Sequence, residues 1–278
     1  MLMKEATQGP LASPFHDGEI LAQQKAGVRS QIGPFAAQAI RPYMPEQHRE
    51  FFKRLPFIVL AARDDKQRPW ASMLCGQAGF IQSPDDKTLA IKSSFSAGDA
   101  LSNSLRADLP IGLLGIMLDA RRRNRMNGHI SDSDSNGITV RVDQSFGNCP
   151  QYISARQWID APAGQTASPA QRSKQLNPKM QRLIAKADTV FLASGKQGSP
   201  SIRSNGMDAS HRGGAAGFVQ VVNPERLLIP DYAGNNFFNT VGNLLIDPAL
   251  GLLFVDFEAG SLLQISGHAE IDWDSDNL

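Results

Sequence analysis

The stretch Gly79-Phe80-Ile81-Gln82 recurs later in the chain as Gly217-Phe218-Val219-Gln220. At the same offset Leu89 recurs as Leu227, so the match continues without a gap. Short runs of this kind, apolar and partly β-branched beside a glycine, are typical of strands entered through a turn. The repeated stretch therefore predicts that one arrangement of strands occurs twice in this chain.

A second set of matches lies one residue out of step with the first. Gly112-Leu113-Leu114 corresponds to Gly251-Leu252-Leu253, and Gly128-His129 corresponds to Gly267-His268. Apolar strands of similar length can align by chance, and that alternative stays open. The shared spacing favours a duplication with one insertion, which predicts two halves related by a pseudo-two-fold axis, the fused counterpart of a dimer.

Strand patterns fill both halves. Phe57 to Ala62 is an apolar run followed by the turn-like segment Asp64 to Pro69, and Thr189 to Ser194 repeats that type of run. Asn136-Gly137 is a strong turn signal before another strand. Ala100 to Leu105 is predicted to be a short helix between strands. The fold class expected is mainly β, barrel-like, with short helices.

The composition along the chain suggests four segments. Residues 1–44 are predicted to be an N-terminal arm with a short helix from Asp17 to Lys25 that is capped by its Asp. Residues 45–158 form the first half, which begins with an amphipathic helix. Residues 159–177, rich in Ala, Gln, Ser and Pro, are a connector. Residues 178–278 form the second half.

The overall composition narrows the class of protein. Of the 278 residues, 41% are hydrophobic and 20% charged, which is ordinary for a packed globular chain. The 28 Lys and Arg balance 27 Asp and Glu, so no nucleic-acid or membrane partner is expected. Two cysteines, Cys75 and Cys149, fit a reducing cytoplasm and no metal motif. No signal peptide and no membrane span are expected.

Several motifs, taken together, match one known family. They are Ser210-His211-Arg212-Gly213-Gly214, Ile229-Pro230-Asp231-Tyr232, Gly234-Asn235, Pro69-Trp70-Ala71-Ser72, Arg121-Arg122-Arg123-Asn124-Arg125 and Gln144-Ser145-Phe146-Gly147-Asn148-Cys149-Pro150. Over about residues 45 to 275 the chain resembles the pyridoxamine 5'-phosphate oxidase-related proteins, whose fold is an FMN-binding split barrel. The resemblance implies two tandem split β-barrel halves that form an intrachain pseudo-dimer, with flavin in the cleft between them.

The first candidate segment for binding the flavin phosphate lies in the second half. Ser210, His211, Arg212 and the backbone of Gly213 offer a hydroxyl, an imidazole, a guanidinium and an amide within four residues. A phosphate needs cationic and neutral donors that converge in this way. The alternative is a surface turn in which Arg212 and the glycines have only structural roles.

A second candidate segment follows the next strand. It comprises Pro230, Asp231, Tyr232, Gly234, Asn235 and Asn236, before a predicted helix from Phe237 to Leu245. Its backbone N–H groups would favour an anion, and Tyr232 would lie beside the ring. The alternative is a helix entry capped by Asn235 or Asn236. The basic clamp that the family has in this loop is replaced here by Gly234-Asn235-Asn236.

Two further candidates come from the first half. An alternating strand would turn Arg121, Arg123 and Arg125 to one face, where they would meet a nicotinamide phosphate or the flavin phosphate. A solvated strand edge explains the same run. Cys149 would approach the ring, or is a small buried group. The first-half loop ends in Asp99, whose carboxylate would repel a phosphate, so one site per chain is expected.

The resemblance implies a flavin-dependent oxidoreductase with FMN, or alternatively FAD, as cofactor. A small electron donor such as NAD(P)H, or a reductase partner, would supply the electrons, and homodimerisation stays open. Whether the chain is an enzyme is undecided, and no catalytic residue is assigned. The alternatives are a non-catalytic electron-relay module and a heme-binding barrel with His129 or His268 as ligand. True pyridoxamine-phosphate oxidation is disfavoured because the clamp departs from the pattern.

Overall fold

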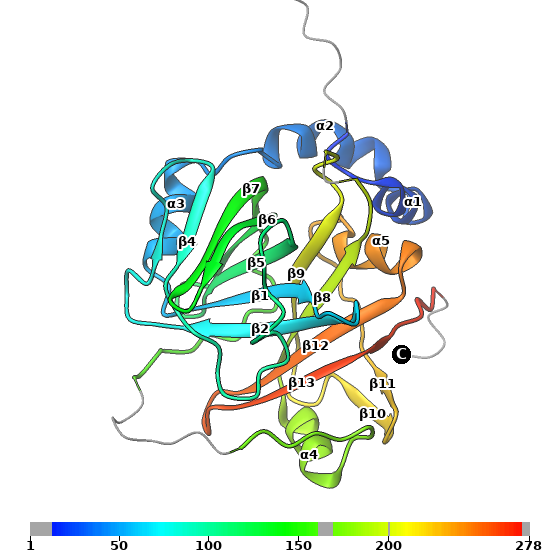
Figure 1. The fold of residues 1–278 in the computed structure, drawn as a ribbon. Helices are drawn as coiled ribbons and strands as arrows, with labels where there is room; N and C mark the ends of the chain where they lie inside the picture. Colours follow the sequence, from blue (N-terminus) through cyan, green and yellow to red (C-terminus); the bar gives the residue numbers. More distant parts are fainter. Residues whose placement is uncertain (1–12, 161–168, 200, 274–278) are drawn as a thin grey trace, which may run out of the picture.

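The computed structural model describes residues 13–160, 169–199 and 201–273 (Figure 1). The first half holds three helices and a seven-stranded sheet. The helices are α1 (Asp17–Lys25), α2 (Arg29–Ala39) and α3 (Glu46–Lys53). The strands are β1 (Phe57–Arg63), β2 (Pro69–Cys75), β3 (Ile81–Gln82), β4 (Thr88–Ile91), β5 (Pro110–Met117), β6 (Arg122–Asp134) and β7 (Gly137–Asn148).

The second half holds two helices, a four-stranded sheet and a two-stranded ribbon. The helices are α4 (Pro178–Lys186) and α5 (Asn239–Ile246). The four-stranded sheet contains β8 (Thr189–Lys196), β9 (Gly206–Gly213), β12 (Ala249–Asp256) and β13 (Ser261–His268). The ribbon pairs β10 (Gln220–Asn223) with β11 (Arg226–Leu228). The fold is therefore mainly β, antiparallel, with short helices, as the sequence predicts.

Both sheets follow the same strand order. The first runs β2-β1-β5-β6 and continues through β7 and β4 to β3, and the second runs β9-β8-β12-β13. In each sheet the first strand of the half, β1 or β8, lies between the second strand, β2 or β9, and the fifth strand, β5 or β12. The halves differ at one edge, because β7 joins β6 to β4. Within the described part of the second half, no strand joins β13 to β11. A tandem origin stays a prediction.

The two sheets pack face to face around a shared core. Phe57, Val59 and Leu114 from the first half are buried with Phe191 and Leu253 from the second. Burial of such side chains is the main force that holds two sheets together. The core therefore fixes how strands of one half lie on strands of the other.

Two glycines lie where strands of the two halves approach each other closely. A Cβ added to Gly112 on β5 would lie 2.6 Å from the Asp208 Cα on β9. One added to Gly251 on β12 would lie 2.7 Å from the Pro69 carbonyl oxygen on β2. Both contacts are with backbone, which cannot move aside as a flexible side chain can. The approach is reciprocal, as a pseudo-two-fold arrangement requires.

The N-terminal region differs from the predicted arm. The helix expected over Asp17–Lys25 forms as α1, but its N-cap is His16, whose Nδ1 accepts from the Gly18 amide at 3.1 Å, so the expected Asp cap is wrong. Figure 1 places α1 beside α5, and Phe15 packs on Phe237 with ring centroids 5.5 Å apart. This packing positions the segment that precedes α5.

Two further findings complete the fold. The helix expected from Ala100 to Leu105 is wrong, because these residues form turns. In the described part of the chain no helix is long and apolar enough to cross a membrane.

Candidate functional site

Strand β9 carries most of the predicted phosphate-binding residues, and it lies against β6 of the first half. Ser210 is fully buried there. Its hydroxyl donates to Asp208 Oδ2 at 2.9 Å and accepts from the Thr240 hydroxyl at 2.7 Å. Ser210 therefore links β9 to the first turn of α5. Its hydroxyl proton is already donated to Asp208.

His211 pairs with Arg123 across the two halves. A guanidinium can only donate, so the 2.8 Å contact between Arg123 and His211 Nδ1 leaves the proton on Nε2. Burial, reinforced by Arg123 and Arg212, holds the pKa of His211 well below its usual range. Burial also lowers the pKa of Arg123 to about 9. His211 is thus a neutral imidazole whose Nε2–H donor has no partner in the structure as described.

Arg212 connects β9 to the second predicted segment. Its Nε donates to Asp231 Oδ1 at 2.6 Å. The neighbouring Tyr232 packs on Tyr152 of the first half, with ring centroids 5.3 Å apart. Strand and loop are therefore brought together as the sequence predicts, but Arg212 is already paired with a carboxylate.

The loop before α5 keeps most of its polar groups local. Asn235 Oδ1 accepts from the Phe237 amide at 3.1 Å, while Asn236 and Phe238 adopt the left-handed backbone conformation at φ 60° and 59°. Phe238, the N-cap of α5, makes no side-chain cap bond. The expectation that an asparagine caps α5 is therefore wrong, because Asn235 closes a turn before the helix begins.

Arg125 is not on a solvated strand edge. Its side chain and that of Asp208 are 6% and 5% exposed, and its NH1 lies 2.9 Å from Asp208 Oδ2. The same nitrogen donates to Asn239 Oδ1 at 3.0 Å. Arg121 does not share this face, because β6 begins at Arg122 and Arg121 lies in the preceding turn with φ 49°. Arg125 is consequently a buried link between β6, β9 and α5.

The end of the first half covers the end of β9. A Cβ at Gly213 would lie 1.9 Å from the Tyr152 carbonyl oxygen, so only glycine fits there. Cys149, which is half-buried, directly follows Asn148, the partner of Arg123 in the β6–β7 ladder, and Arg123 contacts His211 on β9. The structure thus brings Cys149 into the neighbourhood of the β9 residues.

Buried polar atoms without partners concentrate in this region. Of nine such side-chain atoms in the described structure, six lie on β6, the end of β7 and β9: Arg123 Nε, Asn124 Nδ2, Arg125 Nε, Asn127 Oδ1, Asn148 Oδ1 and His211 Nε2. Each unsatisfied buried group costs about 1–3 kcal/mol, so such a cluster favours a ligand with several hydrogen-bonding atoms. A flavin, with its phosphate, hydroxyls and ring heteroatoms, fits this donor set.

An open groove reaches the edge of the cluster. Its lining includes Arg212, Pro230 and Asp231, and also Asp99 and Gln264. Arg123, Arg125 and His211 do not line it. The Arg212–Asp231 pair therefore lies between the groove and the buried cations.

The corresponding position of the first half, at Ser72 and Asp99, has its polar groups paired with one another and with Gln264 of the second half. Ser72 donates to Asp99 at 2.8 Å, and Gln264 Nε2 donates to Ser72 and Asp99 at 2.7 and 3.1 Å. Burial raises the pKa of Asp99. None of these side chains has an unpartnered buried atom in the described structure. The unpartnered buried donors thus lie on the β9 side, and one flavin site per chain stays a prediction.

Comparison with known families gives a match over the second half. Residues 176–278 match the family model described as pyridoxamine 5'-phosphate oxidase. This segment is therefore similar to the pyridoxamine 5'-phosphate oxidase-related proteins. No curated protein and no solved structure matches the chain.

The oxidase-related segment contains β9 and the loop before α5, but neither Arg125 nor Cys149. The family is commonly one of flavin-binding split barrels, and the mainly β fold agrees with it.

In the described part of the chain, no three His, Cys, Asp or Glu side chains are placed to hold a metal ion. The sequence reasoning missed Asp208 and Asn239, of which Asp208 lies two residues before Ser210 and so on its side of the strand.

Proposed function

We propose that the chain binds FMN, with FAD as the alternative, and passes reducing equivalents from a small donor such as NAD(P)H. The observation that carries the proposal is the group of unpartnered buried donors and acceptors on β6, the end of β7 and β9, the last a strand of the oxidase-related segment. When bound, the flavin supplies the electron-transfer chemistry, and the protein supplies binding and orientation. Ser210, His211 and the Gly213 backbone would lie nearest the phosphate that Arg212 holds.

The charges at the site fit an anionic ligand. Arg123, Arg125 and Arg212 all act on His211, whereas Asp208 and Asp231 are the only carboxylates among the described residues that are ion-paired with members of this set. An anion at this place would therefore find a net positive field in a region screened from water. Because His211 stays neutral, it would donate through Nε2–H rather than act as a general acid or base.

A non-catalytic electron-relay module with a reductase partner is the second candidate. The observation that favours it is the absence, among the β9 residues, of a group that titrates near neutral pH, since the pKa of His211 is far below that range. Rapid reduction of the purified protein by NAD(P)H would favour the oxidoreductase, and reduction only after addition of a reductase would favour the relay. A Soret band in place of flavin absorbance would support the heme-binding barrel instead.

Arg212→Ala should weaken FMN binding about ten- to a hundredfold, since a charge-assisted hydrogen bond contributes about 1.5–3 kcal/mol. Riboflavin, which lacks the phosphate, should lose little affinity. The measurement is titration of each ligand by flavin fluorescence. Equal weakening of both ligands would move Arg212 to the ring or to a structural role.

Two control variants sharpen this test. Asp231→Asn removes the carboxylate that competes for Arg212 and should tighten FMN binding while leaving riboflavin unchanged. Arg141→Ala removes an exposed arginine of β7 and should alter neither. Weaker FMN binding by Asp231→Asn would mean that the ion pair builds the site rather than closes it.

A further inference from the structure

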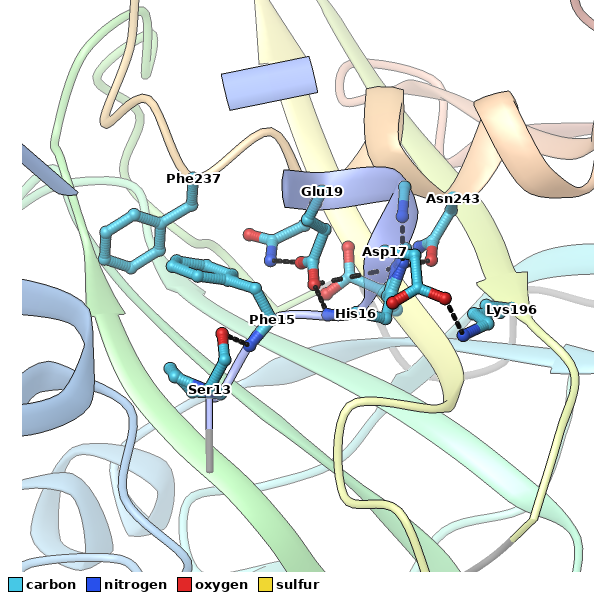
Figure 2. A network of polar contacts seen from close by, with 12 residues as sticks. Ser13, Phe15, His16, Asp17, Glu19, Lys196, Phe237 and Asn243 are labelled. Carbon is cyan, nitrogen blue, oxygen red and sulfur yellow. Dashed lines mark hydrogen bonds and ion pairs between the residues drawn. The ribbon is translucent and has the colours of Figure 1, made fainter. Parts of the chain in front are cut away.

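Helix α1 lies directly on α5, and this contact continues into the candidate site. A Cβ at Gly18 would lie 2.1 Å from the Gly242 carbonyl oxygen, so the two helix backbones touch. Figure 2 shows His16 and Glu19 directed toward α5, with Asn243 on that helix. Asn239 and Thr240, in the first turn of α5, contact Arg125 and Ser210. The N-terminal segment is therefore one contact away from the β9 residues.

Glu19 makes that contact. Its Oε2 accepts from the His16 amide at 2.9 Å, and its Oε1 accepts from Asn239 Nδ2. The other end of the same Asn239 amide, Oδ1, accepts from Arg125. A series of side-chain hydrogen bonds thus runs from Glu19 through Asn239 and Arg125 to Asp208. Each side chain in the series orients the next one.

The charges along this chain do not balance. His16 Nδ1 accepts from the Gly18 amide, so its Nε2 donates to Asn243 Oδ1 at 2.9 Å and the imidazole is neutral. Burial lowers the pKa of His16 to about 4. Asp208 and Glu19 therefore face one buried guanidinium, that of Arg125, which is already paired with Asp208.

The remaining charged neighbours do not restore the balance. Asp17, on α1, is 90% exposed and lies 3.8 Å from Lys196 at the end of β8. Solvent screens that pair, so it adds little to the field at Glu19. Two donors to the Glu19 carboxyl favour its ionised form, but burial outweighs them and, with Asp208 nearby, raises its pKa to about 8.

We propose that Glu19 is a positioning residue for the candidate site: as a neutral acid it keeps α1 on α5 and holds Asn239 against the Arg125–Asp208 pair. Its link to ligand binding rests on the proposed flavin function. Ionisation of Glu19 would place an uncompensated negative charge beside Asp208 and loosen α1 from α5. The N-terminal segment would then respond to pH around neutrality.

The sign follows from linkage. The pKa of Glu19 is higher in the docked state than in the released state, so docking is fully favoured below about pH 4.5. That advantage is lost as pH rises from about 4.5 to about 8 and stays constant above. Glu19→Gln keeps the shape and removes the titration, so it should remove this pH dependence.

The test compares the full chain with Glu19→Gln between pH 5 and 9. Relative to the variant, the wild-type melting temperature should fall by about 5 °C or more over this range. As pH rises, amide hydrogen exchange in α1 and α5 of the wild type should become faster than in the variant. Comparing the two proteins at each pH cancels the intrinsic pH dependence of exchange. The ratio of the wild-type Kd for FMN to that of Glu19→Gln should rise about fivefold or more, because the ratio cancels the titration of the FMN phosphate itself.

Asp17→Asn is the matched control, because it removes an exposed carboxylate from the same helix and should keep the wild-type pH profiles. Parallel stability and exchange profiles for wild type and Glu19→Gln would overturn the proposal, and they are readable without any flavin. If those profiles diverge as expected but FMN fails to bind at all, the flavin function is refuted and the Glu19 docking role stands. If FMN binds with the same pH dependence in both, the link to the site is refuted.

Discussion

Replacing Asp208 with alanine should lower the free energy of unfolding by about 3–5 kcal/mol, because it leaves the buried Arg125 charge without its partner. The two side chains are 6% and 5% exposed, so water cannot readily replace the carboxylate. Ser210 and Asn127 lose an acceptor at the same time. Urea denaturation followed by circular dichroism measures the change, and the melting temperature should fall by roughly 10 °C.

A double variant separates the pair from its surroundings. Arg125→Met combined with Asp208→Leu removes both charges, and replacing a buried ion pair by apolar residues of similar volume is often neutral or stabilising. The double variant should therefore recover most of the stability lost in Asp208→Ala. A loss below about 1 kcal/mol in the single variant would mean that Arg125 reaches solvent and that the buried cluster is not closed. For the same reason, substituting Arg125 cannot serve as a control in the flavin titrations, because loss of the buried pair would change stability as well as binding.

Local sequence patterns predicted much of the fold. The apolar runs at Phe57–Ala62 and Thr189–Ser194 form β1 and β8, because a continuous apolar run suits a strand covered on both faces. The segment from Ala100 to Leu105 has helical composition but forms turns, since tertiary contacts override weak propensity. The docking of α1 on α5 could not be read locally, because it depends on Gly18 meeting Gly242 far along the chain.

Site residues that are adjacent in sequence could be predicted from short motifs. Site residues that only the fold brings together could not. Ser210 to Gly213 and the loop at Asp231 came from short motifs, and the Arg212–Asp231 pair joins them. Glu19 gave no signal, because a single acidic residue in an N-terminal helix usually faces solvent. Its burial follows from α5 packing, which only the three-dimensional structure reveals.

Gly112→Val and Gly251→Val should each lower the free energy of unfolding by about 3 kcal/mol, the upper end for overpacking a filled interior. The first variant presses on β9 at Asp208 and Ala209, and the second presses on β2 at Pro69 and Trp70. Since the blocking atoms are mainly backbone, the strand that faces each glycine must shift locally to admit the side chain. Similar losses are expected because the two contacts are reciprocal. Chemical denaturation of both variants measures them.

Gly267→Ala is the matched control, because a Cβ there meets nothing within 4 Å and its strand is β13 of the same sheet as β12. It should leave stability unchanged or raise it by about 0.5–1 kcal/mol, as replacing glycine in a strand usually does. Ligand binding distinguishes the two valine variants further. Gly112→Val displaces Asp208 and should weaken FMN binding. Gly251→Val displaces β2, the strand that carries Ser72, and should leave FMN binding unchanged. Tolerance of both valines would contradict the close packing of β5 on β9 and of β12 on β2.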